Sequence, residues 1–365
     1  MALAAASDVT ALAKILARRI ATSGPLTLAD YMAECLLHPK YGYYATRDPL
    51  GASGDFTTSP EISQIFGEMI GLCLAQCWID RDRPIPFTLA ELGPGRGTLM
   101  ADIVRTIRTV PGMSEAGRIH FVEASPALRA RQAQTLEGLE PTWHDRVDEL
   151  PDGPLFLVAN EFFDALPIRQ FERREGGWAE RQVALAGGAL ALSLGPVTDY
   201  PALRTRRPDT TPGDVVELCP ALPAIAGDIA GRIAEAGGVA LIVDYGDWRS
   251  LGDTFQAVRS HETSDPLATP GEADLTAHVD FEALSCAFRD AGAAATGMTP
   301  QGVFLERLGV TERARRLADR LSGSALKAHV AAHRRLTHPE EMGSLFKAIA
   351  CYPDGTPPPP GLDPA

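Results

Sequence analysis

The sequence predicts an α/β protein built on a Rossmann-like sheet, with an N-terminal helical segment and with inserted hairpins and loops. Three observations predict this class. From residue 86 onward, short apolar segments alternate with amphipathic ones, which is the pattern of parallel strands joined by crossover helices. A glycine-rich turn follows the first of these apolar segments. The composition of the 365 residues, 45% apolar and 22% charged, is that of a globular enzyme.

The elements of the expected sheet follow one another in a regular order. The first strand is expected at 87–92 and the first amphipathic helix at 98–110, where Leu99, Ile103 and Ile107 share one side. Further expected elements are strands at 118–122, 155–159 and 239–243, a helix at 126–136 and a closing antiparallel strand at 345–352. The alternation of strands and helices implies right-handed crossovers and a largely parallel sheet.

Three segments are expected along the chain. Residues 1–85 predict a helical segment with one long loop, and residues 86–352 predict the sheet domain. Two insertions interrupt that domain: 169–213, whose Gly-Gly pairs predict antiparallel hairpins, and 246–280, which is rich in Gly, Asp and Pro. Residues 353–365 contain four successive prolines and are expected to form a flexible tail.

Charge and composition exclude several classes of function. A net charge of −13 argues against a general affinity for nucleic acid. No apolar segment is long enough for a membrane span. The six cysteines are scattered and form no C-x-x-C pair, which indicates a reducing compartment. The N-terminus is interpreted as a helix of the protein and not as a targeting signal, so a cytoplasmic location is expected. The oligomeric state stays open.

The glycine-rich turn at residues 91–97, with the sequence ELGPGRG, predicts the cofactor. A dinucleotide fingerprint would place a glycine at Thr98, and an acid such as Glu91 would repel a pyrophosphate. S-adenosylmethionine has no phosphate and carries an ammonium and a sulfonium, both of which suit Glu91. Gly93, Gly95 and Gly97 would let the backbone approach the methionine part closely.

Acids also follow the next two expected strands. Glu123 ends the second strand and is expected to accept hydrogen bonds from both ribose hydroxyls; the alternative is a solvated strand end. The third strand is followed by residues 160–164, NEFFD. Here Glu161 or Asp164 would bind a cationic acceptor; alternatively Asn160 or Asp164 caps a helix and the two phenylalanines lie in the core.

Two weaker sets of residues complete the candidates. Asp244 and Tyr245 follow the fourth strand and are expected to line the same crevice. Asp274, His278 and Asp280 have the residue types of a metal site, but their spacing matches no standard one, so no metal is expected.

The motifs, taken in order, resemble those of the MidA-like methyltransferases, whose mitochondrial members are arginine methyltransferases acting in assembly of respiratory complex I. The resemblance covers about residues 29–352. It rests on YGYY at 41–44, GDFTT at 54–58, ELGPGRG at 91–97, VEASP at 122–126, NEFFDALP at 160–167, DYG at 244–246, DLTAHVDF at 274–281 and MGSLFK at 342–347.

The resemblance implies a Rossmann-like methyltransferase core with the helical segment over the active site. It adds Asp55, Phe56, Thr57 and Asn160 to the expected cofactor-binding residues. It also implies a protein substrate, an arginine of a complex I subunit.

The expected reaction is methyl transfer from S-adenosylmethionine to that arginine. Glu161 is the first choice for the carboxylate that orients the guanidinium, and Asp164 is the second. One alternative is a small-molecule O-methyltransferase with a pocket roofed by Tyr43, Phe56 and Phe162 and with His278 as its base. The other is an assembly chaperone that binds S-adenosylmethionine and rarely turns it over.

Overall fold

The computed structural model describes residues 9–46, 57–259 and 262–365. They form two compact units, each built from three stretches of chain. Unit 1 comprises Met1–Phe56, Ala165–Ala221 and Ser250–His278, and unit 2 comprises Thr57–Asp164, Leu222–Arg249 and Val279–Ala365, masked residues excepted. The segments 1–85 and 86–352 remain a prediction about domains, whereas the compact units interleave along the chain.

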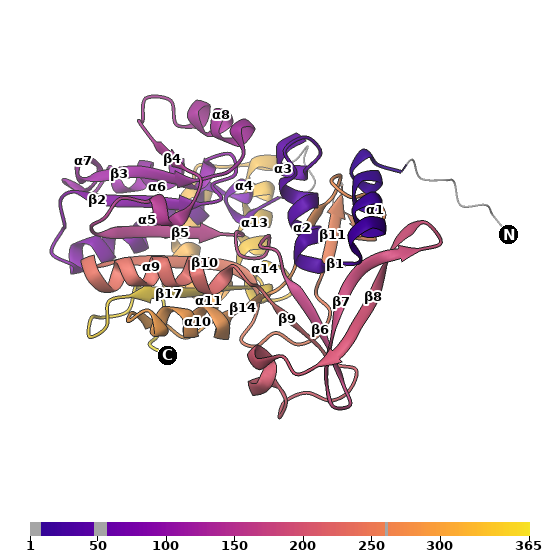
Figure 1. Ribbon diagram of the computed structural model, residues 1–365. Coiled ribbons are helices and arrows are strands. Elements are labelled where there is room, and N and C mark those ends of the chain that lie inside the picture. The colour runs from indigo at the N-terminus through magenta and orange to yellow at the C-terminus, as the bar shows by residue number, and fades with distance from the viewer. Residues whose placement is uncertain (1–8, 47–56, 260–261) are drawn as a thin grey trace. The chain divides into compact units, whose positions relative to one another are not determined.

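Unit 2 contains the expected sheet (Figure 1). Its main strands are β2 (Phe87–Leu92), β3 (Gly117–Val122), β4 (Thr142–His144), β5 (Leu155–Asn160), β10 (Gly238–Asp247) and β17 (Phe346–Tyr352). They lie in the order β17-β10-β5-β2-β3-β4. Strands β2, β3, β4, β5 and β10 pair with one another in parallel, and β17 pairs antiparallel with β10. The predicted parallel sheet and its closing antiparallel strand are confirmed.

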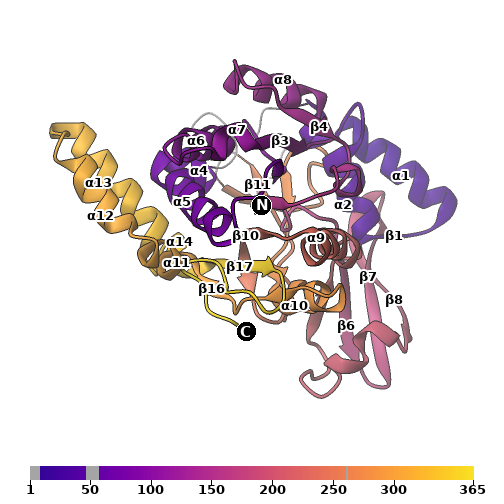
Figure 2. The ribbon, with the colours of Figure 1, turned by 90° about the vertical axis from the view of Figure 1, so that its left-hand side faces the viewer.

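Helices cover both faces of this sheet (Figure 2). On one face lie α5 (Gln64–Asp80) and α6 (Thr98–Ile107), and on the other α9 (Leu222–Ala236) and α10 (Phe281–Asp290). Glycines let α5 approach α6 closely: a Cβ on Gly67 would lie 2.4 Å from Cβ of Asp102, and one on Gly71 would lie 2.9 Å from Cβ of Thr106. This contact helps to hold α6, whose N-terminus follows the glycine turn.

The remaining elements of unit 2 are between two and fifteen residues long. They are α4 (Ser59–Ile62), α7 (Met113–Ala116), α8 (Pro126–Thr135), η1 (Val147–Glu149), β14 (Val279–Asp280), β15 (Ala294–Ala295), β16 (Thr299–Pro300), α11 (Gln301–Arg307), α12 (Val310–Ala318), α13 (Gly323–Thr337) and α14 (Met342–Leu345). No sequence pattern predicted the four helices between β16 and β17.

The C-terminal residues, for which the prolines predict a flexible tail, pack against unit 2. Leu362 is 5% exposed and belongs to the core of the unit. The backbone N–H of Gly297 donates to the carbonyl oxygen of Asp363 at 2.9 Å. The prolines prevent regular secondary structure in this segment, but they do not prevent burial of an apolar side chain.

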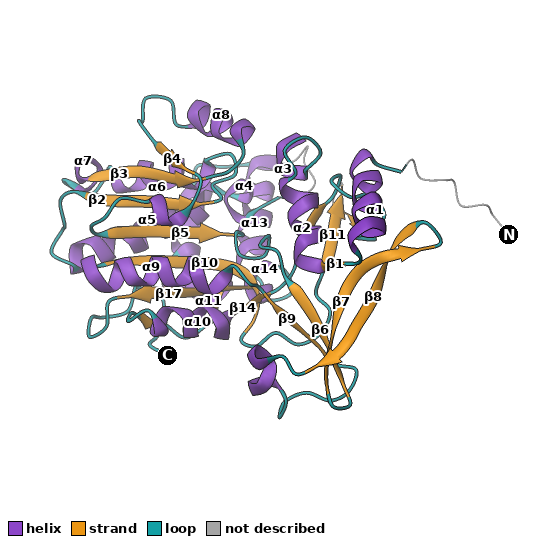
Figure 3. Ribbon diagram, in the orientation of Figure 1, coloured by secondary structure: helices purple, strands orange, loops and turns teal. Residues whose placement is uncertain are grey.

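Unit 1 combines N-terminal helices with two antiparallel sheets (Figure 3). Its elements are α1 (Ala11–Ser23), β1 (Leu26–Thr27), α2 (Leu28–Leu37), α3 (Tyr43–Thr46), β6 (Arg169–Arg174), β7 (Gly177–Ala186), β8 (Ala189–Thr198), η2 (Pro201–Arg206), β9 (Val215–Leu218), β11 (Gln256–Arg259), β12 (Glu262–Ser264) and β13 (Asp274–Thr276). The turns at Gly176-Gly177 and Gly187-Gly188 join antiparallel strands, as predicted. Across the described parts of both units, no helix is long and apolar enough to span a membrane.

Candidate active site

The glycine turn lies at the carboxyl end of β2, directly before α6. Gly93, Gly95 and Gly97 have φ angles of 57°, 53° and 80°, in the left-handed region that favours glycine. A Cβ on Gly93 would lie 2.9 Å from Cδ2 of Phe162. Side chains at these positions would therefore strain the turn or collide with its cover, and the bare backbone remains open to close approach by a ligand.

Two buried oxygens beside this turn lack hydrogen-bond partners within the described residues. They are Oε2 of Glu91, which is 3% exposed, and Oδ1 of Asn160. In the β2–β5 register Glu91 lies opposite Val158, so Asn160 lies on the same face of the sheet. Burial raises the pKa of Glu91 well above its ordinary value, and a backbone hydrogen bond from Met100 opposes the rise. Because unpaired buried acceptors are costly, the pair fits a cationic ligand such as the ammonium of S-adenosylmethionine.

Glu123, directly after β3, is tied to the glycine turn by a buried glutamine. Its Oε1 accepts from the backbone N–H of Ser125 at 2.8 Å, and its Oε2 accepts from Nε2 of Gln132 at 3.2 Å. The same nitrogen of Gln132 donates to the carbonyl of Gly95 at 2.8 Å, and Trp143 donates to the amide oxygen of Gln132. A carboxylate has about four acceptor positions, so the ribose hydroxyls can still bind Glu123.

Glu161, at the end of β5, is held in an unusual conformation. Its φ is 53°, in the left-handed region. Its Oε1 accepts from the backbone N–H of Ser59 and from Nδ2 of Asn160, both at 2.9 Å, whereas Oε2 accepts no hydrogen bond from the described residues. Burial raises the pKa of Glu161 to about 7; the Ser59 hydrogen bond opposes this, and the nearby Asp164 carboxyl adds to it.

Asp244 of β10 holds the turn that carries Glu161 and Asp164. It is fully buried, and its Oδ2 accepts from the backbone N–H groups of Phe162, Phe163 and Asp164 at 3.2, 2.9 and 3.3 Å. Burial raises its pKa well above the ordinary value, and the carboxyl of Asp164 raises it further. The weaker sequence candidate is thus a positioning residue for the stronger ones.

The arrangement after β5 excludes the helix-capping part of the structural interpretation of residues 160–164. Residues 161–168 form turns and bends without a helix, so Asn160 and Asp164 cap no helix there. Phe163 is in the core, as the structural interpretation expected, but Phe162 is only partly buried and lies against Gly93. Asp164 is 6% exposed and within electrostatic reach of Glu161.

Some predicted residues lie elsewhere or outside the described part. Asp55 and Phe56 are outside the described residues, and Thr57 is half-buried two residues before Ser59. His278 is assigned to unit 1 and Asp280 to unit 2. Among the residues that the structure describes, no three His, Cys, Asp or Glu side chains group as metal ligands.

Sequence reasoning missed three residues of the site. Ser59 and Gln132 are fully buried polar side chains, and Glu61 accepts a hydrogen bond from Thr98 Oγ1 at 2.5 Å, at the start of α6. Gln132 lies in a polar helix where no periodicity distinguishes it. For Ser59 the only signal was the Ser-Pro pair, which is typical of a helix start.

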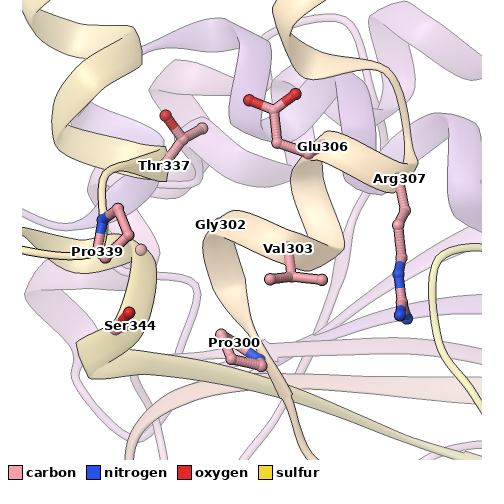
Figure 4. A pocket seen from close by; sticks show the side chains of 9 residues that line it. Pro300, Gly302, Val303, Glu306, Arg307, Thr337, Pro339 and Ser344 are labelled. Atoms are coloured by element: carbon pink, nitrogen blue, oxygen red, sulfur yellow. The ribbon is translucent and has the colours of Figure 1, made fainter.

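A groove of about 490 Å³ lies elsewhere in unit 2, between α11, α14 and the end of α13 (Figure 4). Glu306 and Arg307 are the titratable residues that line it, and neither the glycine turn nor the acids at the strand ends contribute. Gln301 begins α11, next to lining residues, but its side chain hydrogen-bonds to Ser59 and to the carbonyl of Leu336. None of the predicted site residues therefore lines this groove.

A Rossmann-like sheet with an acid-flanked glycine turn, a second acid after the next strand and orphaned buried acceptors defines the class I S-adenosylmethionine-dependent methyltransferases. Comparison with known proteins agrees. The family described as "Putative S-adenosyl-L-methionine-dependent methyltransferase" matches residues 69–299. The chain belongs to this methyltransferase family, and the predicted cofactor is confirmed.

Curated relatives cover nearly the whole chain. The mitochondrial protein arginine methyltransferase NDUFAF7 homolog of Drosophila melanogaster is 37% identical over 94% of this chain and 85% of its own. The mitochondrial protein arginine methyltransferase NDUFAF7 of Homo sapiens is 36% identical over 96% and 85%. A crystal structure from Burkholderia thailandensis bound to S-adenosyl-homocysteine is similar with a TM-score of 0.84 and 28% identity, covering 96% of this chain and 94% of that one.

These relatives correct one expectation. The N-terminus predicted a cytoplasmic protein, but the relatives are named as mitochondrial proteins, and the cytoplasmic assignment was wrong. The physical reason is that the lack of a recognised targeting pattern carries no information about location. The relatives' names also do not favour the small-molecule alternative.

Proposed function

We propose that this methyltransferase acts on an arginine of a protein, and that Glu161 orients the guanidinium. The observation that carries the proposal is the asymmetry of the Glu161 carboxylate. One oxygen is fixed by Ser59 and Asn160, and the other accepts no hydrogen bond from the described residues. A carboxylate held by one oxygen at the sheet's carboxyl edge suits a planar cation. The names of the curated relatives support the arginine acceptor.

In the proposed reaction, one set of residues binds the cofactor and a second set orients the acceptor. S-adenosylmethionine supplies an activated methyl group, so the protein mainly aligns the acceptor and excludes water. Glu91, the glycine turn, Glu123 and Asn160 would bind the cofactor. Glu161 would fix the plane of the guanidinium so that one nitrogen faces the methyl group, with Asp164 as the second choice. Phe162, against Gly93, would separate the two ligands from solvent.

The finer proposal names the acceptor. The family resemblance implies an arginine of a respiratory complex I subunit, and the mitochondrial relatives are consistent with it. Asp55, Phe56 and Thr57 stay proposals for the cofactor site on the same resemblance.

The test is methyl transfer to whole-cell protein with radiolabelled S-adenosylmethionine, followed by size separation and amino-acid analysis. The expected result is label in methylarginine of one protein. Glu161→Gln should reduce transfer by on the order of 2–4 kcal/mol of transition-state stabilisation, while S-adenosylhomocysteine affinity barely changes. Glu115→Gln, in α7, is the matched control.

Label in small molecules, or no label in any fraction, would reject the arginine acceptor. If Glu161→Gln remains fully active while the wild type methylates arginine, Asp164 takes the orienting role. Loss of the folded state in Glu161→Gln would instead assign Glu161 a structural role.

A further inference from the structure

The helical hairpin of α12 and α13 has a charge opposite to that of the rest of the protein. Between Val310 and Thr337 there are seven Lys and Arg and two Asp and Glu, in a chain with a net charge of −13. The helices pack against each other in unit 2 (Figure 2), where Nε2 of His329 lies 2.9 Å from the carbonyl oxygen of Ala314. This helical hairpin thus carries a net positive charge in an acidic protein.

Several of these cations form no ion pair within the described part of the protein. Arg315, Arg320 and Lys327 are exposed, and their side chains form no ion pair or hydrogen bond with described residues. Helix dipoles favour cations in the last turn of each helix, which accounts for Arg315. They do not account for Lys327, which lies in the N-terminal half of α13.

Helix α13 also buries unusually few side chains for a long helix. Of its 15 residues only Leu336 is buried. Val330 is 57% exposed, and Ala328 and Ala331 beside it are exposed as well. A helix that covers so little core can present small apolar side chains together with cations such as Lys327 to a partner.

The base of the hairpin is fixed to the elements beside Glu161. Arg313 of α12 pairs with the buried Glu68 of α5 through two contacts of 2.7 and 3.1 Å. At the end of α13, the carbonyl of Leu336 accepts from Gln301, and the charge of Arg335 lowers the pKa of Glu161. A macromolecule bound along the hairpin would therefore extend from its cations toward Glu161 at its base.

We propose that the hairpin of α12 and α13 is a docking surface for an acidic region of the protein acceptor, beside the arginine that is methylated. The proposal rests on the proposed function, because the acceptor is taken to be a protein. Cations at a distance from the reacting atoms would raise the rate of encounter and lower KM without changing the chemical step. They would also offset the repulsion between an acidic acceptor region and the acidic remainder of the chain.

A protein surface suits the hairpin better than nucleic acid does. A polyphosphate would meet an overall charge of −13, and the exposed Val330 and alanines are matched by side chains, not by phosphates. The nearby groove contributes no net charge, because Glu306 and Arg307 are its titratable lining residues. Charge recognition therefore resides on the helices.

The test measures binding directly, by fluorescence anisotropy of two labelled peptides in the presence of S-adenosylhomocysteine. One peptide has a single arginine followed by a run of glutamates, and the other has glutamines instead. The acidic peptide should bind more tightly, and added salt should weaken it. The triple variant Arg315→Gln, Arg320→Gln, Lys327→Gln should weaken that binding by about tenfold. The matched control is Arg108→Gln, Arg131→Gln, Arg289→Gln, three exposed cations elsewhere in unit 2, and it should change binding less than about twofold.

Equal binding of the two peptides, or equal weakening by the two triple variants, would overturn the docking surface. Tighter binding of a DNA duplex that depends on the same three cations would overturn it in favour of a nucleic-acid site. Binding of the acidic peptide with the expected variant effects, but without methylation of any protein, would reject the proposed function and leave the docking surface supported.

Discussion

The two halves of the active site differ in how far along the chain their parts lie. In the cofactor half, Glu91, the glycine turn, Glu123 and the bridging Gln132 lie within residues 91–132, and Asn160 is added at the end of β5. In the acceptor half, Glu161 is held by Ser59, 102 residues away, and the turn after it by Asp244, about 80 residues away. The cofactor half is formed by adjacent βα units, and the acceptor half by contacts that exist only in the folded sheet.

The two halves also depend on different physical properties: the cofactor half on backbone conformation and the acceptor half on buried hydrogen bonds. The cofactor half depends on backbone angles that favour glycine, so substitutions of its glycines should impair both local stability and ligand binding. The acceptor half depends on a buried carboxyl that satisfies several backbone N–H groups at once. Substitutions there should impair folding or turnover and leave cofactor affinity intact.

The largest effect is expected at Asp244. Asp244→Ala leaves the N–H groups of residues 162–164 without their acceptor and should lower the free energy of unfolding by about 4 kcal/mol. Asp244→Asn keeps an acceptor oxygen and should retain most of the stability, with turnover reduced more than S-adenosylhomocysteine affinity. Urea denaturation and calorimetry measure the two quantities. Equal stability of Asp244→Ala and the wild type would show that the turn holds itself.

A smaller loss, confined to the cofactor half, is expected at Glu123. Glu123→Ala should weaken S-adenosylhomocysteine binding by about 2 kcal/mol, because charge-assisted hydrogen bonds to the ribose are removed. Gln132→Ala should cause part of the same loss, since it connects Glu123 to Gly95. Gln134→Ala, on the same helix, is the control. Calorimetry that finds unchanged affinity in Glu123→Ala would place the ribose elsewhere.

The pH dependence of turnover tests the ionisation of Glu161 in the acceptor half. Because only the ionised form of Glu161 binds a guanidinium well and its pKa is about 7, turnover should increase with pH through that value. The increase should be about tenfold between about pH 6 and about pH 8. The same shift from 4.5 to about 7 implies that folding stability falls with rising pH across that interval, since the folded state holds the proton more tightly. Both slopes should flatten in Glu161→Gln, and a slope that persists there would belong to another group.

The smallest expected effect is the difference in stability between two glycine variants, and it isolates the contact between Gly93 and Phe162. Gly93→Ala and Gly138→Ala both place alanine at a positive φ, which should cost about 1–2 kcal/mol of stability each. A Cβ on Gly138 has no neighbour within 4 Å, whereas one on Gly93 meets Phe162. Gly93→Ala should therefore lose about 1 kcal/mol more and should alone weaken S-adenosylhomocysteine binding. Equal losses would show that Phe162 moves aside freely.

The sheet was predictable because its strands are short apolar segments separated by turn residues. The sequence 87–92 is buried along its whole length, as a central parallel strand should be. Helix α13 was not predictable for the opposite reason: it buries one side chain, so it has no apolar periodicity to recognise. The tail was mispredicted because proline content does not reveal whether Leu362 finds a core.

The sequence by itself determined the cofactor class and the glycine turn, because an acid next to three alternating glycines restricts both backbone angles and ligand charge within a few residues. It also placed acids after the strands, whose carboxyl ends must meet at one edge of a parallel sheet. Only the tertiary structure decided which acid holds the turn and which one presents an oxygen. The reason is that Asp244 and Glu161 differ in their backbone partners, and those partners, residues 162–164 and Ser59, reach them only when the sheet has formed.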